Sequence, residues 1–221
     1  MAILVAPMAL PATDDDNGWQ FTTHHVVDTQ GKALSVVYTN DPVSVERSIQ
    51  TMEQFLAKDK YQVVGFDLEY TTGMIRRLSS PSCACGMTSS STTTTWPQGL
   101  ASVSPVLSRA STKSAVDTTN DLKALKVSCL KCPNLVIIQD HYKVWGSTKN
   151  KLNSLVDLTS AIIDPYYKKM KDESKKYKDT WHSVWHKRLD EEHVKYAAND
   201  AYTSYTMYMR IVDMRKCLVH D

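Results

Sequence analysis

Long apolar runs, paired cysteines and a large excess of one charge are all missing from this chain, and each absence excludes a class of protein. No apolar run is long enough to cross a bilayer, so we expect no membrane-spanning helix and no membrane partner. Residues 1–11 lack the Lys or Arg that opens a secretory signal, and we interpret residues 1–18 as a flexible tail. The five scattered cysteines are an odd number, which argues against a disulfide framework and favours a reducing intracellular compartment, the nucleus or the cytoplasm.

Several motifs of common catalytic and metal sites are missing as well. The sequence has no phosphate-binding glycine loop, no Gly-x-Ser-x-Gly nucleophile motif and no His-Glu-x-x-His zinc motif. Cys129 and Cys132 form one Cys-x-x-Cys pair, but a structural zinc site needs four ligands and no second pair stands at a suitable spacing. We therefore interpret these two thiols as buried or unreactive.

Composition and periodicity describe one globular domain of the α/β class. The 221 residues are enough for a good core, and 42% hydrophobic with 23% charged residues are ordinary values for a globular protein. Strands alternate with helices along the chain, which favours an α/β fold. We expect a hairpin at 21–28 and 32–39, a strand at 61–70, and helices at 44–57, 122–130, 152–163 and 191–217.

Five residues from three separated segments form a candidate metal site. Asp67 and Glu69 follow an apolar run in the expected 61–70 strand, and alternate residues of a strand point to the same face. Tyr196 and Asp200 stand four positions apart in the last expected helix, so they also share a face. Asp121 lies where a strand gives way to a helix.

Each of these residues also has a simpler explanation. Asp121, beside an asparagine, equally suits the N-cap of the helix that follows it. Tyr196 and the later tyrosines of the same helix suit an aromatic core face, with Asp200 as a surface charge among them. Asp67 and Glu69 suit turn or surface positions, although acids directly after Val-Val-Gly-Phe are unusual for a purely structural strand.

The order of these acids resembles that of the DnaQ-like, or DEDD, 3′-to-5′ exonucleases. The match is closest to the Werner-type exonuclease domains of plants, and it covers roughly residues 19–218. The first motif is Asp67-Leu-Glu69, the second centres on Asp121, and the third is Tyr196-Ala-Ala-Asn-Asp200. A Tyr four positions before the last Asp resembles the DEDDy subclass. The resemblance implies that residues 19–221 form an exonuclease domain with a ribonuclease H-like fold, in which helices flank a mixed central sheet.

The resemblance also implies the chemistry of the site. Two divalent cations, Mg²⁺ or Mn²⁺, would be held by Asp67, Glu69, Asp121 and Asp200, because hard cations prefer carboxylate oxygens. Tyr196 would orient the attacking water. The implied activity is hydrolysis of phosphodiester bonds at the 3′ ends of nucleic acids, single strands or duplex ends, with release of nucleoside 5′-monophosphates. No protein partner is indicated.

A run of lysines ahead of the last expected helix is a candidate contact for the phosphate backbone. The net charge of +2 gives no global attraction to nucleic acid, so a local basic patch is needed. The alternative is a solvated loop whose charges are partly offset by neighbouring acids. The candidate residues are Lys168, Lys169, Lys175 and Lys176.

Residues 77–114 do not fit the resemblance. The family has strands and a helix there, whereas this chain has low-complexity Ser and Thr runs. In a frame that begins one base earlier, Ser codons of the TCN type would encode Phe, Leu, Ile or Val, and Thr codons would encode Tyr, His, Asn or Asp. We interpret the segment as a damaged or disordered insert translated out of frame. A weak or inactive relative, which binds nucleic acid or is the product of a damaged gene copy, is therefore the alternative function.

Overall fold

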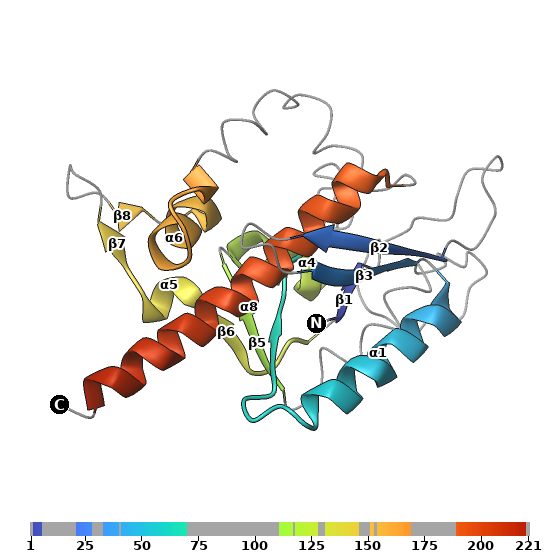
Figure 1. Ribbon diagram of the computed structural model, residues 1–221, viewed down its shortest axis with the longest axis horizontal. Coiled ribbons are helices and arrows are strands. Elements are labelled where there is room, and N and C mark those ends of the chain that lie inside the picture. The colour runs from blue at the N-terminus through green and yellow to red at the C-terminus, as the bar shows by residue number, and fades with distance from the viewer. Residues whose placement is uncertain are drawn as a thin grey trace.

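The structure is a computed structural model that describes residues 2–5, 21–27, 33–39, 41–69, 111–116, 118–127, 131–145, 151–152, 154–168 and 189–219. These residues form a mixed α/β arrangement, as the sequence predicts (Figure 1). The strands are β1 (Ala2–Val5), β2 (Phe21–Val27), β3 (Ala33–Thr39), β4 (Val63–Gly65), β5 (Thr112–Ala115), β6 (Leu135–Ile137), β7 (Val144–Trp145) and β8 (Lys151–Leu152). The helices are α1 (Pro42–Leu56), α4 (Thr119–Val127), α5 (Ile138–His141), α6 (Leu155–Ile162) and α8 (Glu191–Val219).

The first sheet contains the predicted hairpin and one strand that the sequence did not predict. β2 pairs antiparallel with β3, which confirms the hairpin. β1 pairs parallel with the other edge of β3, so the strand order is β1-β3-β2. The expectation of a flexible tail is therefore wrong for residues 2–5, and the rest of the expected tail, 6–18, lies outside the described residues.

Local sequence signals set the ends of the helices. Asp41 caps α1 by accepting hydrogen bonds from the backbone N–H groups of Val43 and Ser44, with a proline at the first helical position, so α1 starts slightly before the predicted residue 44. Ser154 caps α6 in the same way. α4 and α8 begin within a few residues of their predicted starts. Phe55, near the C-terminal end of α1, is 61% exposed.

A second, parallel sheet carries the candidate site. Its strand order is β4-β5-β6, and α8 crosses it diagonally, in contact with β4 and β5 (Figure 1). β4 is far shorter than the predicted 61–70 strand, and the Phe66 N–H, one residue past its end, still donates to the Ser114 carbonyl oxygen at 2.8 Å. The resemblance implies one mixed central sheet, whereas the described strands form three separate sheets, the third being the β7-β8 pair.

The central strand β5 lies within the segment interpreted as damaged or disordered. Thr112, Lys113 and Ser114 pair with β4, and Lys113 and Ser114 also pair with β6, so the expected disorder is wrong for these residues, while their out-of-frame origin stays a prediction. Residues 77–110 lie outside the described residues. A Thr-Lys-Ser-Ala strand in the middle of a parallel sheet is unusual, because such strands are normally runs of apolar residues.

α8 connects two separate groups of buried residues. The first core cluster contains residues of β3, of the N-terminal half of α8 and of the segment just before that helix: Leu34, Val36, Tyr38, Leu189, Val194, Ala198 and Tyr202. The second core cluster contains residues of α5, α6 and the C-terminal half of α8, together with the residue that follows β5: Val116, Ile138, Leu158, Ile162, Met207 and Ile211. Among the described helices, none combines the length and apolar character that a bilayer crossing requires.

Candidate metal centre

Three acids that are far apart in the sequence converge at the junction of β4 and α8. Asp67 and Glu69 come directly after β4, at the carboxyl end of a parallel strand, and Asp200 comes from α8. One carboxylate oxygen from each of the three lies within 4.8 Å of the others. Carboxylate oxygens are the ligands that Mg²⁺ and Mn²⁺ prefer. This cluster could hold a metal ion, and its formation is the central geometric prediction from the sequence.

Burial dominates the electrostatics of the cluster. It raises the pKa of Asp67 to about 6, and it raises the pKa of Asp200 well above its ordinary value, with a further increase from the charge of Asp67. Burial together with the charges of Asp67, Asp200 and Asp121 raises the pKa of Glu69 to about 9. Without a cation the three groups therefore do not all ionise at neutral pH. A divalent cation supplies the positive charge that removes this penalty.

Hydrogen bonds inside the cluster stabilise its partly protonated, metal-free form. The protonated carboxyl group of Glu69 donates a hydrogen bond to Asp67. The backbone N–H of Leu68 donates to the Asp67 carboxylate as well and offsets part of the effect of burial on its pKa. This hydrogen bond links two of the three acids that would hold a metal ion.

Asp121 lies close to the cluster but outside its inner group. The residue is 6% exposed, and its charge contributes to the raised pKa of Glu69. It is not one of the described acids whose oxygens meet within 4.8 Å. α4 begins at Thr119, and the Leu122 N–H donates to the Thr118 carbonyl oxygen at 2.8 Å, so Asp121 sits inside the first turn. The alternative role of Asp121 as N-cap is therefore wrong.

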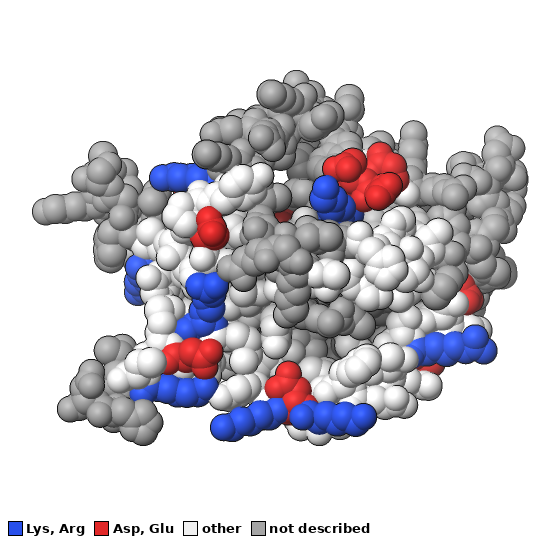
Figure 2. All heavy atoms as spheres, in the orientation of Figure 1, with Lys and Arg blue, Asp and Glu red and all other residues white. Residues whose placement is uncertain are grey.

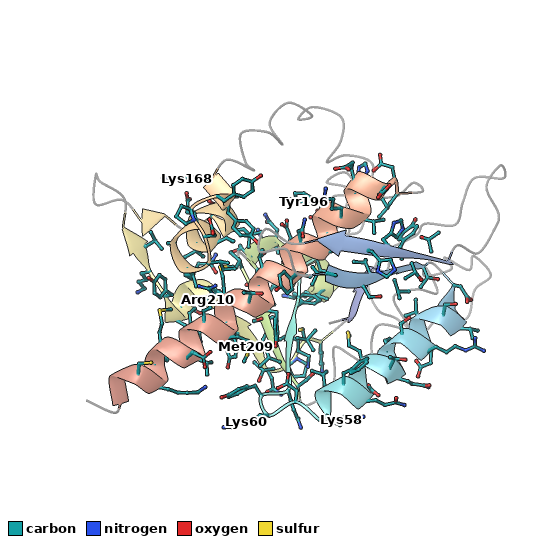
Figure 3. All side chains as sticks on the ribbon, in the orientation of Figure 1. Lys58, Lys60, Lys168, Tyr196, Met209 and Arg210 are labelled. Carbon is teal, nitrogen blue, oxygen red and sulfur yellow. The ribbon has the colours of Figure 1, made fainter. Side chains whose placement is uncertain are left out.

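Tyr196 faces the same cluster from one turn earlier on α8, in the half of the helix nearer its N-terminal end (Figure 3). Its hydroxyl group donates a hydrogen bond to the Asp200 carboxylate. Burial and the charges of Asp200 and Glu69 raise its pKa, so the phenol stays protonated and remains a donor. Tyr196 also packs against the first core cluster, so the aromatic-core alternative describes part of its environment.

The predicted lysine contacts for nucleic acid are only partly within the described structure. Lys168 is exposed and lies beside α6, on the other side of α8 from Lys58 and Lys60 (Figure 3). Lys169, Lys175 and Lys176 lie outside the described residues. On the described part of the face in Figure 2, basic and acidic side chains are interspersed and do not form one basic patch.

The Cys-x-x-Cys pair is also only half described. Cys132 is half-buried, and burial raises the pKa of its thiol. Cys129 lies outside the described residues. Among the described residues, the acids at the end of β4 and on α8 form the one group with metal-ligand geometry.

Two residues beside the site were not singled out from the sequence. Gly65 lies in β4 against the backbone of α8, and Ser114 lies between β4 and α8. A glycine inside a strand signals close approach of another backbone, so Gly65 was detectable in principle. Ser114 has no such signal, because a serine within a Ser/Thr-rich segment is indistinguishable from its neighbours. Comparisons with protein-family models, with curated proteins and with solved structures find no match to this chain.

Proposed function

We propose that this chain is a metal-dependent 3′-to-5′ exonuclease with a ribonuclease H-like fold, of the DEDDy type. The proposal rests chiefly on one observation: Asp67, Glu69 and Asp200 bring carboxylate oxygens within 4.8 Å of one another from two segments that are far apart in the sequence. The Tyr196 hydroxyl group is hydrogen-bonded to Asp200. A tyrosine at this position is what separates a DEDDy-type site from an ordinary cluster of acids.

The residues divide into metal-holding and water-orienting groups. Asp67, Glu69 and Asp200 would hold the first divalent cation, Mg²⁺ or Mn²⁺, and the nearby buried Asp121 would support the second. When bound, a pair of such cations about 3.5–4 Å apart supplies a water of lowered pKa and neutralises charge on the scissile phosphate and the leaving oxygen. Four carboxylates shared by two cations would leave coordination positions for water and phosphate oxygens.

Tyr196 would act on the nucleophile and not on the metal. Its raised pKa keeps the hydroxyl group protonated at neutral pH, so it is a donor throughout. Its contact with Asp200 places that donor beside a metal-holding carboxylate, where it can orient an attacking water toward the phosphorus atom. The product of attack at a 3′-terminal linkage is a nucleoside 5′-monophosphate.

A weak or inactive relative is the second candidate, and the composition of β5 favours it. Lys113 and Ser114 are fully buried in the strand beside β4, where a parallel sheet normally has apolar residues. Ligands must be held to a fraction of an ångström, and polar substitutions in the supporting sheet reduce that precision. An out-of-frame origin of β5 predicts paired compensating insertions and deletions when the coding DNA is aligned with that of a close paralogue.

A labelled single strand separates the two candidates. The exonuclease releases labelled mononucleotides from the 3′ end in Mn²⁺ or Mg²⁺, and release stops with EDTA and with Asp67→Ala. Asp213→Asn is the matched control, because Asp213 is an exposed acid on α8, paired with Lys216 away from the cluster. Binding of the strand without metal and without product supports the inactive relative. Metal-dependent release that survives in Asp67→Ala overturns the proposed active site.

A further inference from the structure

β4 and α8 approach each other more closely at Gly65 than any side chain allows. A Cβ atom at this position would lie 1.9 Å from the Ala201 carbonyl oxygen, and 2.9 Å from both the backbone nitrogen and the Cβ atom of Tyr205. The nearest atoms belong to the helix backbone, so no side-chain rotation relieves the overlap. Any residue other than glycine therefore pushes β4 and α8 apart or moves one along the other.

Ser114 joins the same two elements from the neighbouring strand. Its hydroxyl oxygen lies 3.1 Å from the Ser204 carbonyl oxygen of α8 and 3.4 Å from the Val64 carbonyl oxygen of β4. Its own carbonyl oxygen accepts from the Phe66 N–H at 2.8 Å. The side chain is completely buried. Ser114 thus contacts β4 on both sides of Gly65, and α8 within one turn of Ala201.

The residues that meet where β4 packs on α8 are close in sequence to the acids of the cluster. Gly65 is two residues before Asp67, and Ala201 directly follows Asp200. A shift of β4 along α8, or away from it, therefore moves Asp67 and Glu69 relative to Asp200 by nearly the same distance. Gly65 has no side chain that could bind metal, and the Ser114 hydroxyl group is in contact with the Ser204 and Val64 carbonyl oxygens.

We propose that Gly65 and Ser114 are positioning residues for the metal centre: they set how closely, and in which register, β4 docks on α8, and so hold Asp67 and Glu69 within ligand distance of Asp200. The inference rests on the proposed metal-dependent function. It adds that Ser114 has a geometric role at the site, whether or not the segment that contains it is translated out of frame.

A purely structural role predicts a different result from a positioning role. Residues that only pack the core change stability, and in the folded molecules they leave metal affinity unchanged. Positioning residues change metal affinity at temperatures where the protein is fully folded. The decisive readout is therefore Mn²⁺ affinity of the folded full chain, and it requires no catalysis.

The experiment compares Gly65→Ala and Ser114→Ala with wild type and with Leu158→Ala. Leu158 is fully buried in the second core cluster, so its truncation destabilises the protein without altering the contact between β4 and α8. Mn²⁺ affinity is measured by titration calorimetry and by the electron paramagnetic resonance signal of free Mn²⁺, after near-UV circular dichroism shows a folded state. We expect about ten- to a hundredfold weaker binding for Gly65→Ala, about tenfold weaker for Ser114→Ala, and wild-type affinity for Leu158→Ala.

Two outcomes overturn the inference in distinguishable ways. Wild-type affinity in folded Gly65→Ala and Ser114→Ala shows that the contact only packs the core, while the proposed metal centre stands. A wild-type protein that binds no Mn²⁺ overturns the metal centre itself, and the positioning role with it. If Gly65→Ala does not fold, Ser114→Ala decides, because it removes one hydroxyl group and adds no atoms.

Discussion

The Tyr196 hydroxyl group donates a hydrogen bond to the Asp200 carboxylate, one turn further along α8. The two side chains share a helix face because residues four apart are neighbours on a helix. The bond therefore depends on a single element, whereas the contact of Asp200 with Asp67 and Glu69 depends on how β4 docks on α8. Tyr196 and the three acids can thus be tested separately.

Replacement of Tyr196 by Phe should reduce turnover without removing the metal. The ring keeps its packing against the first core cluster, and only the hydroxyl donor is lost. We expect kcat for mononucleotide release to fall about a hundredfold or more, as for the loss of a group that orients a proton transfer. Mn²⁺ affinity should change little, because Asp67, Glu69 and Asp200 remain. Single-turnover kinetics and calorimetry measure the two quantities.

Tyr208→Phe is the control for this substitution. Tyr208 lies on the same helix and packs against the second core cluster, so its hydroxyl group is remote from the acids. Its loss should leave both kcat and Mn²⁺ affinity unchanged. A Tyr196→Phe protein with wild-type kcat would show that the phenol has no part in the reaction.

Without metal, the protein should become less stable as the pH rises from about 4 to 9. The folded-state pKa values of Asp67 and Glu69, about 6 and about 9, lie above the ordinary values of 3.8 and 4.5. Between these limits the folded state keeps protons that the unfolded chain has released, so ionisation favours unfolding. Each retained proton lowers the free energy of unfolding by about 1.4 kcal/mol per pH unit. Denaturant unfolding in EDTA at pH 5 and pH 8 measures this.

Glu69→Gln tests the source of that pH dependence. The neutral amide cannot ionise, so the decrease in stability above pH 6 should become smaller, and the protein at pH 8 should be more stable than wild type in EDTA. Glu192→Gln is the control, since Glu192 is an exposed acid at the start of α8. Greater stability of the metal-free wild type at pH 8 than at pH 5 would contradict the predicted repulsion.

Divalent cations should reverse the same effect. An ion that binds only the folded state at a hundred times its Kd adds about 2.7 kcal/mol to the free energy of unfolding. We expect Mn²⁺ at pH 8 to raise the Tm of wild type and to leave that of Asp200→Asn nearly unchanged, because the substitution removes one of the three converging carboxylates. An equal rise in Asp200→Asn would place the bound ion at another site.

Local signals in the sequence predicted the helices to within a few residues. The caps at Asp41 and Ser154 were not used for the predicted starts at 44 and 152, although each depends only on bonds within a few residues. The helix face that carries Tyr196 and Asp200 follows from the spacing of these residues alone. These features were predictable because the physical interactions behind them are local.

The strands of the sheets were less predictable because their pairing is long-range. β1 has no partner near it in the sequence, and only its pairing with β3 makes it a strand. β5 has no apolar alternation, since Thr-Lys-Ser-Ala is a poor strand pattern, and its place between β4 and β6 defines it. The convergence of Asp67 and Glu69 with Asp200 is also long-range: spacing predicted the shared face of each pair, and the family resemblance added the reason to join the pairs in one site.

Replacement of Lys113 by Met should stabilise the protein. Lys113 is 1% exposed in the central strand, its Nζ lies 3.5 Å from the Pro133 carbonyl oxygen, and burial lowers the pKa of its ammonium group. Methionine has a similar length and no charge to desolvate, so we expect the free energy of unfolding to rise by on the order of 1 kcal/mol. For a chain of this size, that raises the Tm by about 2–4 °C.

The control, Lys123→Met, changes an exposed lysine on α4 and should alter stability by less than about 0.5 kcal/mol. A lower Tm for Lys113→Met would show that the polar contacts of the ammonium group outweigh its desolvation.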